Sequence, residues 1–307
     1  MEFMVGTYTP EEERGTVMSG ERVLYGAQNI DVEDVMMYGG ESPVKECRNV
    51  TLKDVTFGWK YPLWYSRDIT MTDSIWTSYA RAGGWYVDNL VIKNTPIKAP
   101  KCIRKCNGVV LENVEFPEGE ETLWNCTDVD LKNVTVKGDY FGMGCSNVKV
   151  DGLKLVGHYT FDSCHDMELR NVDIDSRDTF WNCENITVYD SHIKGEYMGW
   201  NSKNLTFINC TLESLQGFCY IDNLKMVDCK LQDSPYSFEF CTNMDVHAEG
   251  KCDIVLNPGS GVLELTEIGQ LIQDPDRVNA ADLTVLCDNI GERLDKVVYD
   301  ENPYGFE

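Results

Sequence analysis

The sequence predicts an all-β fold, a single parallel β-helix (solenoid) of about twelve coils with a cap at each end. Three observations lead to this prediction. A polar residue or glycine followed by an aliphatic residue recurs every 19–21 residues, apolar and polar residues alternate after it, and a Gly, Asn or Asp follows five residues later. We call the recurring residue the anchor; the anchors are Asn29, Asn49, Asp68, Asn89, Gly108, Asp128, Asn147, Asp166, Asn185, Asn204, Asn223 and Asn243.

The coil that starts at Asp128 illustrates the pattern. Val129 and Leu131 alternate with polar residues, which is the period of a strand with one buried face. Asn133 interrupts the alternation, and the same pattern resumes through Val136. Each coil is therefore expected to carry two short strands that are joined by a one-residue bend.

The bend positions predict left-handed corners, because Gly, Asn and Asp tolerate positive φ better than other residues. Stacked asparagines in this column can also form hydrogen bonds from coil to coil. The bend residues are Asp34, Asp54, Asp73, Asn94, Asn113, Asn133, Gly152, Asn171, Asp190, Asn209 and Asp228.

A second column, two residues before the anchor, is rich in cysteine and predicts a tight inward corner in which the thiol acts as a compact apolar group. Its cysteines are Cys47, Cys106, Cys126, Cys145, Cys164, Cys183 and Cys241. A metal or redox ladder is the alternative. We predict free thiols, no metal and no cofactor, because the side chains should run parallel and no histidine clusters beside the close pair Cys102 and Cys106.

The repeat sets the domain boundaries. Residues 1–28 lack the anchor pattern and are predicted to be an N-terminal cap, residues 29–250 form the β-helix, and residues 251–307 form a C-terminal cap and acidic tail. We expect one structural domain overall.

The net charge and the hydropathy of the chain limit the classes of partner that it can bind. The chain of 307 residues has a net charge of −24, which disfavours nucleic acid and anionic lipid as partners. The first residues lack the features of a signal peptide, and no later run reaches the roughly 18 apolar residues that span a bilayer. We therefore expect a cytoplasmic protein without membrane or nucleic-acid partners.

The segment before each anchor carries the aromatic residues and is the candidate site. Flat, regularly spaced rings suit the binding of a carbohydrate or another ring-containing ligand. The alternatives are a structural role and an oligomer contact between copies of the chain. The candidate residues are Trp64, Trp85, Trp124, Trp181 and Trp200, with Arg104 and Asp162 in the same column, four residues before the anchor, and Tyr61, Tyr140, Tyr159 and Tyr197 seven residues before it.

Catalysis by this face is the weaker hypothesis. Glycoside cleavage uses two carboxyl groups that lie roughly 5–9.5 Å apart. Asp162 and Asp178 are predicted on the aromatic face at about 11 Å from each other, estimated from strand rise and coil spacing. Glu239 has no evident partner in the sequence. We lean against an enzyme, and catalytic residues stay unknown.

A third hypothesis is an acidic solenoid that binds proteins or mimics DNA. Anchors and bends lie five residues apart, as in pentapeptide-repeat proteins. The 19-residue coil is not a multiple of five, however, and the rest of each coil lacks the motif.

Several short segments resemble a known family. They are Tyr61–Tyr65, Leu123–Cys126, Phe180–Cys183, Asn257–Gly261 and Glu267–Ile272. In these segments the chain is similar to an uncharacterised bacterial family of pectate-lyase-like, right-handed parallel β-helices. The resemblance implies a right-handed coil, and the wider superfamily, which includes polysaccharide lyases and glycoside hydrolases, implies sugar chemistry by analogy of fold alone.

Overall fold

The structure is a computed structural model that describes residues 8–9 and 11–296, and its contacts divide the chain into two compact units, residues 1–180 and 181–307. We call them the N-terminal unit and the C-terminal unit and describe each by itself. Both consist of parallel strands, and the only helical segment in the described ranges is a single 3₁₀ turn, η1 (Ala280–Asp282). The predicted class, an all-β parallel solenoid, is confirmed.

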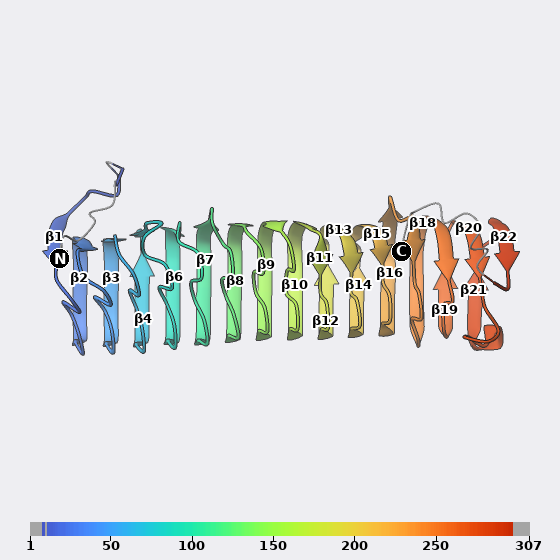
Figure 1. The fold of residues 1–307 in the computed structure, drawn as a ribbon, viewed down its shortest axis with the longest axis horizontal. Helices are drawn as coiled ribbons and strands as arrows, with labels where there is room; N and C mark the ends of the chain where they lie inside the picture. Colours follow the sequence, from blue (N-terminus) through green and yellow to red (C-terminus); the bar gives the residue numbers. More distant parts are fainter. Residues whose placement is uncertain (1–7, 10, 297–307) are drawn as a thin grey trace. The chain divides into compact units, whose positions relative to one another are not determined.

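In the N-terminal unit, successive rungs lie side by side (Figure 1). Strands β1, β2, β3, β4, β6, β7, β8, β9 and β10 pair in this order, always in parallel. The strands are β1 (Thr16–Ser19), β2 (Gln28–Tyr38), β3 (Arg48–Phe57), β4 (Arg67–Thr72), β5 (Ile75–Trp76), β6 (Asp88–Pro96), β7 (Asn107–Phe116), β8 (Thr127–Lys137), β9 (Ser146–Gly157), β10 (His165–Ser176) and β11 (Asp178–Thr179).

The C-terminal unit has two parallel ladders that meet in its longest strand, β18. One ladder runs β12–β14–β16–β18–β19–β21, and the other runs β13–β15–β17–β18–β20–β22. The strands are β12 (Glu184–Tyr189), β13 (His192–Met198), β14 (Lys203–Ile208), β15 (Thr211–Gly217), β16 (Asp222–Gln232), β17 (Tyr236–Ser237), β18 (Met244–Leu256), β19 (Gly261–Glu264), β20 (Glu267–Ile272), β21 (Leu283–Leu286) and β22 (Ile290–Leu294).

The solenoid has about 15 turns instead of the twelve that the repeat suggests. The additional turns come from strands that do not show the anchor pattern. β1 adds a rung before β2 in the N-terminal unit, and β19 to β22 continue the two ladders of the C-terminal unit. In these last rungs Gly261 and Leu283 lie in register with Met244. The residues that precede them, Ser260 and Asp282, follow Asn243 at steps of 17 and 22 residues, so the regular period of 19–21 residues is lost.

The corners follow the predicted columns. Every bend residue has a positive φ, as Asn133 does with φ +51°, and so has every anchor, which the sequence analysis did not foresee. The predicted side-chain ladders are present as well. In the bend column Asn133 donates to Asn113 (3.2 Å), Asn113 donates to Asn94 (3.0 Å) and Asn94 donates to Asp73 (3.0 Å). These amide rows hold neighbouring corners in register.

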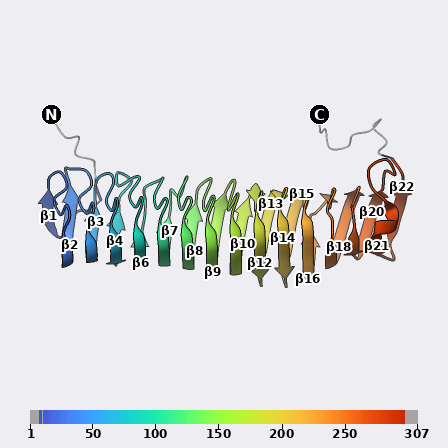
Figure 2. The same ribbon diagram turned by 90° about the horizontal axis from the view of Figure 1, so that it is seen from below.

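The core lies inside the coils, and like residues stack on like. Val129 pairs with Val148, and Val148 pairs with Met167 in the next rung. All three side chains are buried, as the alternation predicts. The irregular segments that precede the anchors gather along one side of the N-terminal unit (Figure 2).

The corner geometry gives a testable prediction. Replacing Asn133 with Val puts a β-branched residue at φ +51° and removes the hydrogen bond to Asn113. We expect Asn133→Val to lower the free energy of unfolding by roughly 1–3 kcal/mol. Chemical denaturation measures the change. Thr135→Val, an exposed position in the same strand, is the matched control and should change stability little; equal unfolding of both variants would contradict a strained corner.

Candidate functional site

The segment before each anchor has an inner and an outer column. From Val44 to Phe238 the residues five before the anchor, among them Leu123 and Phe161, are buried, as predicted. Four before the anchor, the five tryptophans, Arg104 and Asp162 are half-buried, whereas Tyr25 is exposed and Cys219 is buried. The tryptophan column therefore lies at the surface of the coil with part of each ring accessible to solvent.

In the N-terminal unit the tryptophans stack on one another along the solenoid. The rings of Trp64 and Trp85 have centroids 5.3 Å apart and are only 10° from parallel. Their indole N–H groups donate to main-chain carbonyls of the next rung: Trp64 to Ala82 (2.6 Å) and Trp85 to Lys101 (2.9 Å). Trp124 makes the same type of bond to the carbonyl of Tyr140 (2.5 Å).

Arg104 occupies the position between Trp85 and Trp124 and replaces a ring. Its guanidinium carbon lies 5.2 Å from the ring centroid of Trp85 and 4.2 Å from that of Trp124. Nε and Nη2 of Arg104 both donate to the main-chain carbonyl of Glu121, at 3.0 and 2.7 Å. Glu121 lies seven residues before the next anchor, the same position whose carbonyl accepts the indole N–H in the tryptophan rungs. Nη2 also contacts the Glu121 carboxylate at 2.7 Å. Arg104 is thus fully engaged within the ladder.

A second ladder, one residue further along the segment, is more exposed and was missed in the sequence. Tyr65 and Tyr86 are parallel within 2°, with centroids 4.9 Å apart. Lys45 lies over Tyr65 at 5.7 Å, and Lys105 lies over Tyr86 at 5.6 Å. The two tyrosines are 51% and 38% exposed, and neither hydroxyl has a hydrogen-bond partner in the described part of the chain. We call these four residues the tyrosine ladder; a search of the column three before the anchor would have found it.

The remaining predicted residues of the N-terminal unit lie beside these ladders. Tyr61 packs against Trp64 at 4.6 Å, and Tyr140 and Tyr159 stack at 4.8 Å with rings 4° from parallel. Asp162, in the tryptophan column, is half-buried and accepts a hydrogen bond from the hydroxyl of Ser163 (2.7 Å). All of them belong to the same irregular segments.

The C-terminal unit has its own aromatic cluster. Trp181, Trp200 and Tyr197 contact one another with centroids 5.9–6.3 Å apart. Trp200 continues to Tyr220 (5.1 Å), a residue that the sequence analysis did not select. Tyr220 in turn contacts Phe240 at 5.4 Å.

Glu239 lies beside this cluster. The structure gives it two partners, Tyr236 and Arg277, that could not be identified from the sequence. It is half-buried, hydrogen-bonded to Tyr236 and close to the charge of Arg277. Burial raises the pKa of Glu239 above its ordinary value, and Tyr236 and Arg277 offset this only in part. Arg277 itself lies over Phe240 at 5.9 Å.

The ring geometry changes how the aromatic face can bind. In the N-terminal unit, Trp85, Tyr65 and Tyr86 each have a neighbouring ring against one face and a ring or cation against the other. A sugar ring cannot stack on a face that is already occupied. The accessible parts are ring edges and phenol hydroxyls, which bind a ligand through hydrogen bonds rather than through stacking.

The predicted placement of Asp178 on the aromatic face is wrong. Asp178 is only 2% exposed, and its neighbours Ser176 and Thr179 are fully buried. The segment turns inward because the amide of Thr160 and the hydroxyl of Ser176 both donate to the Asp178 carbonyl. Asp162 and Asp178 therefore do not form a surface pair for glycoside cleavage.

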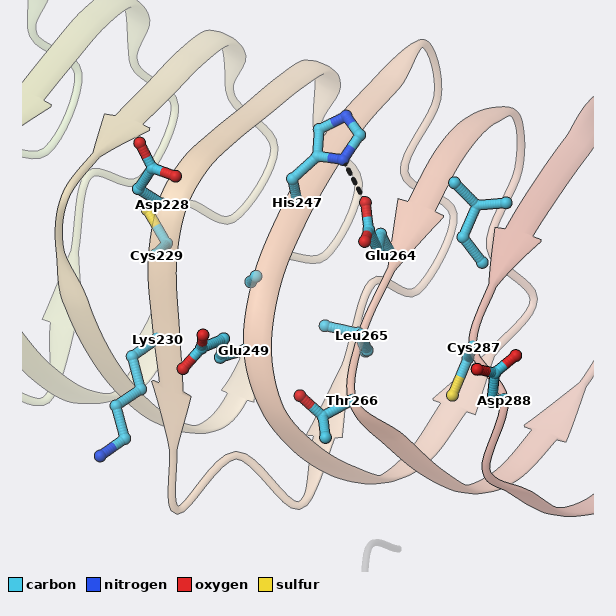
Figure 3. A pocket seen from close by; sticks show the side chains of 12 residues that line it. Asp228, Cys229, Lys230, His247, Glu249, Glu264, Leu265, Thr266, Cys287 and Asp288 are labelled. Atoms are coloured by element: carbon cyan, nitrogen blue, oxygen red, sulfur yellow. Dashed lines mark hydrogen bonds and ion pairs between the residues drawn. The ribbon is translucent and has the colours of Figure 1, made fainter.

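A groove of about 710 Å³ lies in the C-terminal unit, on the bend side of β16, β18, β19 and β21 (Figure 3). It arises where the pairing of β16 with β18 shifts register between Met226 and Cys229, so that the regular corner is lost. His247 and Glu264 contact one another across its rim at 2.5 Å. The hydrogen bond with Glu264 raises the pKa of His247, and Asp245 adds to the effect. Its lining is mixed, with four acidic residues (Asp228, Glu249, Glu264 and Asp288) beside Lys230 and the apolar Ala248, Leu265 and Leu286.

The cysteine column plays a polar role at the corner. Cys106, Cys145 and Cys164 each donate from sulfur to a carbonyl of the preceding rung, at 3.2, 3.0 and 2.8 Å. Ser66 makes the same bond to Val44 (2.6 Å). All thirteen cysteines are free, and burial raises the pKa of Cys102 to about 12. The thiols thus behave as weak hydrogen-bond donors in addition to filling space.

In the described ranges, no group of three or more His, Cys, Asp or Glu side chains is placed to hold a metal ion. The same residues contain no helix that is long and apolar enough to cross a membrane.

The sequence of the chain matches a known protein family. Residues 11–286 match the family described as "Protein of unknown function (DUF3737)". The chain belongs to this family. No curated protein matches it.

Several solved structures are similar. A tailspike protein mutant of E. coli bacteriophage HK620, in complex with a pentasaccharide, is 9% identical, with 91% of this chain and 70% of that chain covered and a TM-score of 0.40. The surface adhesin PfbA of Streptococcus pneumoniae is 12% identical (88% and 76% covered, TM-score 0.32). The pentapeptide-repeat protein HetL of the cyanobacterium Nostoc is 8% identical (72% and 92% covered, TM-score 0.28). Identities and scores this low carry no information about ligand or activity. The narrower likeness to pectate lyases stays a prediction.

The role of Arg104 can be tested by two substitutions. Arg104→Ala uncovers the faces of Trp85 and Trp124 and leaves the Glu121 carbonyl without its donor, so we expect a loss of roughly 1–3 kcal/mol in unfolding free energy. Arg104→Trp should recover at least half of that loss, because an indole in this column reaches the same carbonyl. Thermal denaturation compares the two; a Trp variant as unstable as the Ala variant would exclude the shared role.

Thiol accessibility gives an independent test of the corners. Cys287 is partly exposed, whereas the other twelve cysteines are buried. We expect a disulfide reagent such as DTNB to modify one thiol rapidly in the native protein and all thirteen after denaturation. Cys287→Ser should abolish the rapid phase. Rapid modification of several thiols in that variant would show that the cysteine column is accessible.

Proposed function

We propose that the chain is a binding protein that recognises a polyhydroxylated ligand, a carbohydrate, along the tyrosine ladder of the N-terminal unit. The observation that carries the proposal is the pair of exposed hydroxyls on Tyr65 and Tyr86, which have no protein partner in the described residues. Stacking at 4.9 Å and flanking by two lysines fix the rings, so binding costs little side-chain entropy.

The chemistry of the ladder suits a sugar in a specific way. A phenol hydroxyl both donates and accepts, as a sugar hydroxyl does, and Lys45 and Lys105 add donors at the two ends. The covered ring faces favour contact through edges, so the rings serve as rigid supports for their hydroxyls. The neighbouring row of Trp64, Trp85, Arg104 and Trp124 stabilises the same segments.

The proposal does not include catalysis. Asp178 is buried and cannot pair with Asp162 at the surface, and Glu239, whose pKa is raised, lies in the other unit. A cytoplasmic location and self-association stay predictions.

A glycan array followed by titration calorimetry tests the proposal. Tyr65→Phe/Tyr86→Phe keeps the stacked rings and removes only the hydroxyls. Two lost hydrogen bonds should weaken binding of the best glycan roughly ten- to hundredfold. Tyr220→Phe, an exposed tyrosine of the C-terminal unit, is the matched control and should bind like the wild type.

Two results would contradict the proposal. Binding that the Phe pair retains would locate the ligand elsewhere, and the absence of any glycan bound at millimolar concentration would exclude this class of ligand. Circular dichroism of the Phe pair confirms that the fold is unchanged.

A further inference from the structure

One part of the outer surface differs from the rest of the N-terminal unit. Alternation points the residue seven past each anchor outward, and in later rungs it is exposed and polar, as Glu115, Thr135, Lys154 and Asp173 are. In the first three anchored rungs the same column holds Met36, Thr56 and Ile75, which are in register and only 4%, 0% and 9% exposed. An outward, apolar and yet buried surface must be covered.

The chain's own N-terminal segment runs over this surface. We call residues 8, 9 and 11–14 the strap. The hydroxyl of Tyr8 donates to the carbonyl of Gly58 (2.8 Å), and its ring contacts Tyr79 and Tyr38 at 5.7 and 6.4 Å. Gly58 permits this approach, since a Cβ there would lie 3.1 Å from the Tyr8 oxygen. Burial raises the pKa of Tyr8 to about 12.

Two charged residues fasten the rest of the strap. Glu12 is buried and accepts from Lys98 at 2.9 Å, and Arg14 donates to the carbonyl of Asp73 at 2.7 Å. Burial raises the pKa of Glu12, but hydrogen bonds from Thr9 and Lys98 outweigh it and leave this pKa below its ordinary value. The strap is therefore held by complementary charge as well as by apolar contact.

The fit of the strap is nevertheless incomplete. The hydroxyls of Thr56 and Thr77 and the Nε of Arg14 are buried without a hydrogen-bond partner among the described residues. Each such group destabilises the covered state, because it has lost its hydrogen bonds to water without gaining new ones. The amides of Thr9, Glu12 and Glu13 bond within the strap, so side chains attach it rather than sheet pairing. A better-fitting segment can displace a cover that is attached in this way.

We propose that the outer surface of β2, β3 and β5, with Lys98 beyond the end of β6, is a docking site for a peptide segment of another protein, and that the strap occupies and autoinhibits it. The surface is made of Met36, Thr56 and Ile75, the carbonyl of Gly58 and the cation of Lys98. Its partner is an extended acidic segment that carries one aromatic residue.

The features of the surface define this chemistry. Lys98 requires a carboxylate, and the slot over Gly58, between Tyr38 and Tyr79, takes an aromatic side chain with a donor at its tip. The buried hydroxyls of Thr56 and Thr77 can donate to main-chain carbonyls that the strap does not offer. An incoming segment competes with a strap whose effective concentration is on the order of millimolar, so displacement requires these additional bonds or an opened strap.

Fluorescence anisotropy with a labelled peptide of residues 8–15 tests the proposal on the full chain. The strap-opened variant is Tyr8→Ala/Glu12→Ala, and Glu11→Ala/Glu13→Ala, at exposed positions of the strap, is the matched control. We expect the opened variant to bind the peptide at least roughly tenfold more tightly than the wild type and the control. Lys98→Glu in the opened variant should abolish binding, because it reverses the charge that receives the carboxylate.

Limited trypsin digestion of the wild type provides a second measurement that needs no variant. Excess peptide should accelerate cleavage after Arg14, because it holds the strap away from the surface. Failure of the peptide to bind the opened variant, or to accelerate this cleavage, overturns the proposal. A concentration-dependent dimer of the wild type that the opened variant loses would assign the surface to a second copy and also overturn it.

Discussion

The structure depends on one backbone constraint, the left-handed conformation of the anchor and bend residues. A rung of about twenty residues closes on itself only if the chain turns sharply at fixed places, and L-residues other than Asn and Asp adopt positive φ at a cost. The amide rows of Asn94, Asn113 and Asn133 add hydrogen bonds between rungs at these corners. Equal turns in successive rungs bring equivalent residues into register, and the core columns and surface ladders follow from that register.

Register explains why the rings of the aromatic face stack on one another and leave their edges accessible. Rings that repeat in register come to lie about one strand spacing apart and therefore stack on one another, as Tyr65 and Tyr86 do at 4.9 Å. The faces of these rings then contact neighbouring side chains and are not available to a ligand. Arg104 fits between two indoles because its planar guanidinium can cover ring faces and donate to the same carbonyl. Edges and hydroxyls are what such a ladder offers to a ligand.

Departures from the repeat create the other surface features. The shift in pairing between β16 and β18 removes a corner and opens the groove beside His247. In the first rungs, apolar residues in an outward column produce a surface that the strap covers, although it leaves Thr56 and Thr77 without partners. The proposed ligand site and the proposed docking site belong to different columns of the repeat, three before and seven past the anchor, so one unit can carry both.

The sequence by itself determined the solenoid, its corners and its buried columns, because each depends on the conformational preference or the polarity of single residues that recur at a fixed period. Strand parity also pointed the tryptophan column outward but left its exposure open, and the structure has these indoles half-buried. The tertiary structure decided what a period cannot encode. Whether a ring shows its face or its edge depends on the ring in the next rung, and the burial of Asp178 depends on how its segment turns. The rungs after Asn243 and the strap contacts of Glu12 with Lys98 join residues without a repeating pattern, so only the folded chain brings them together.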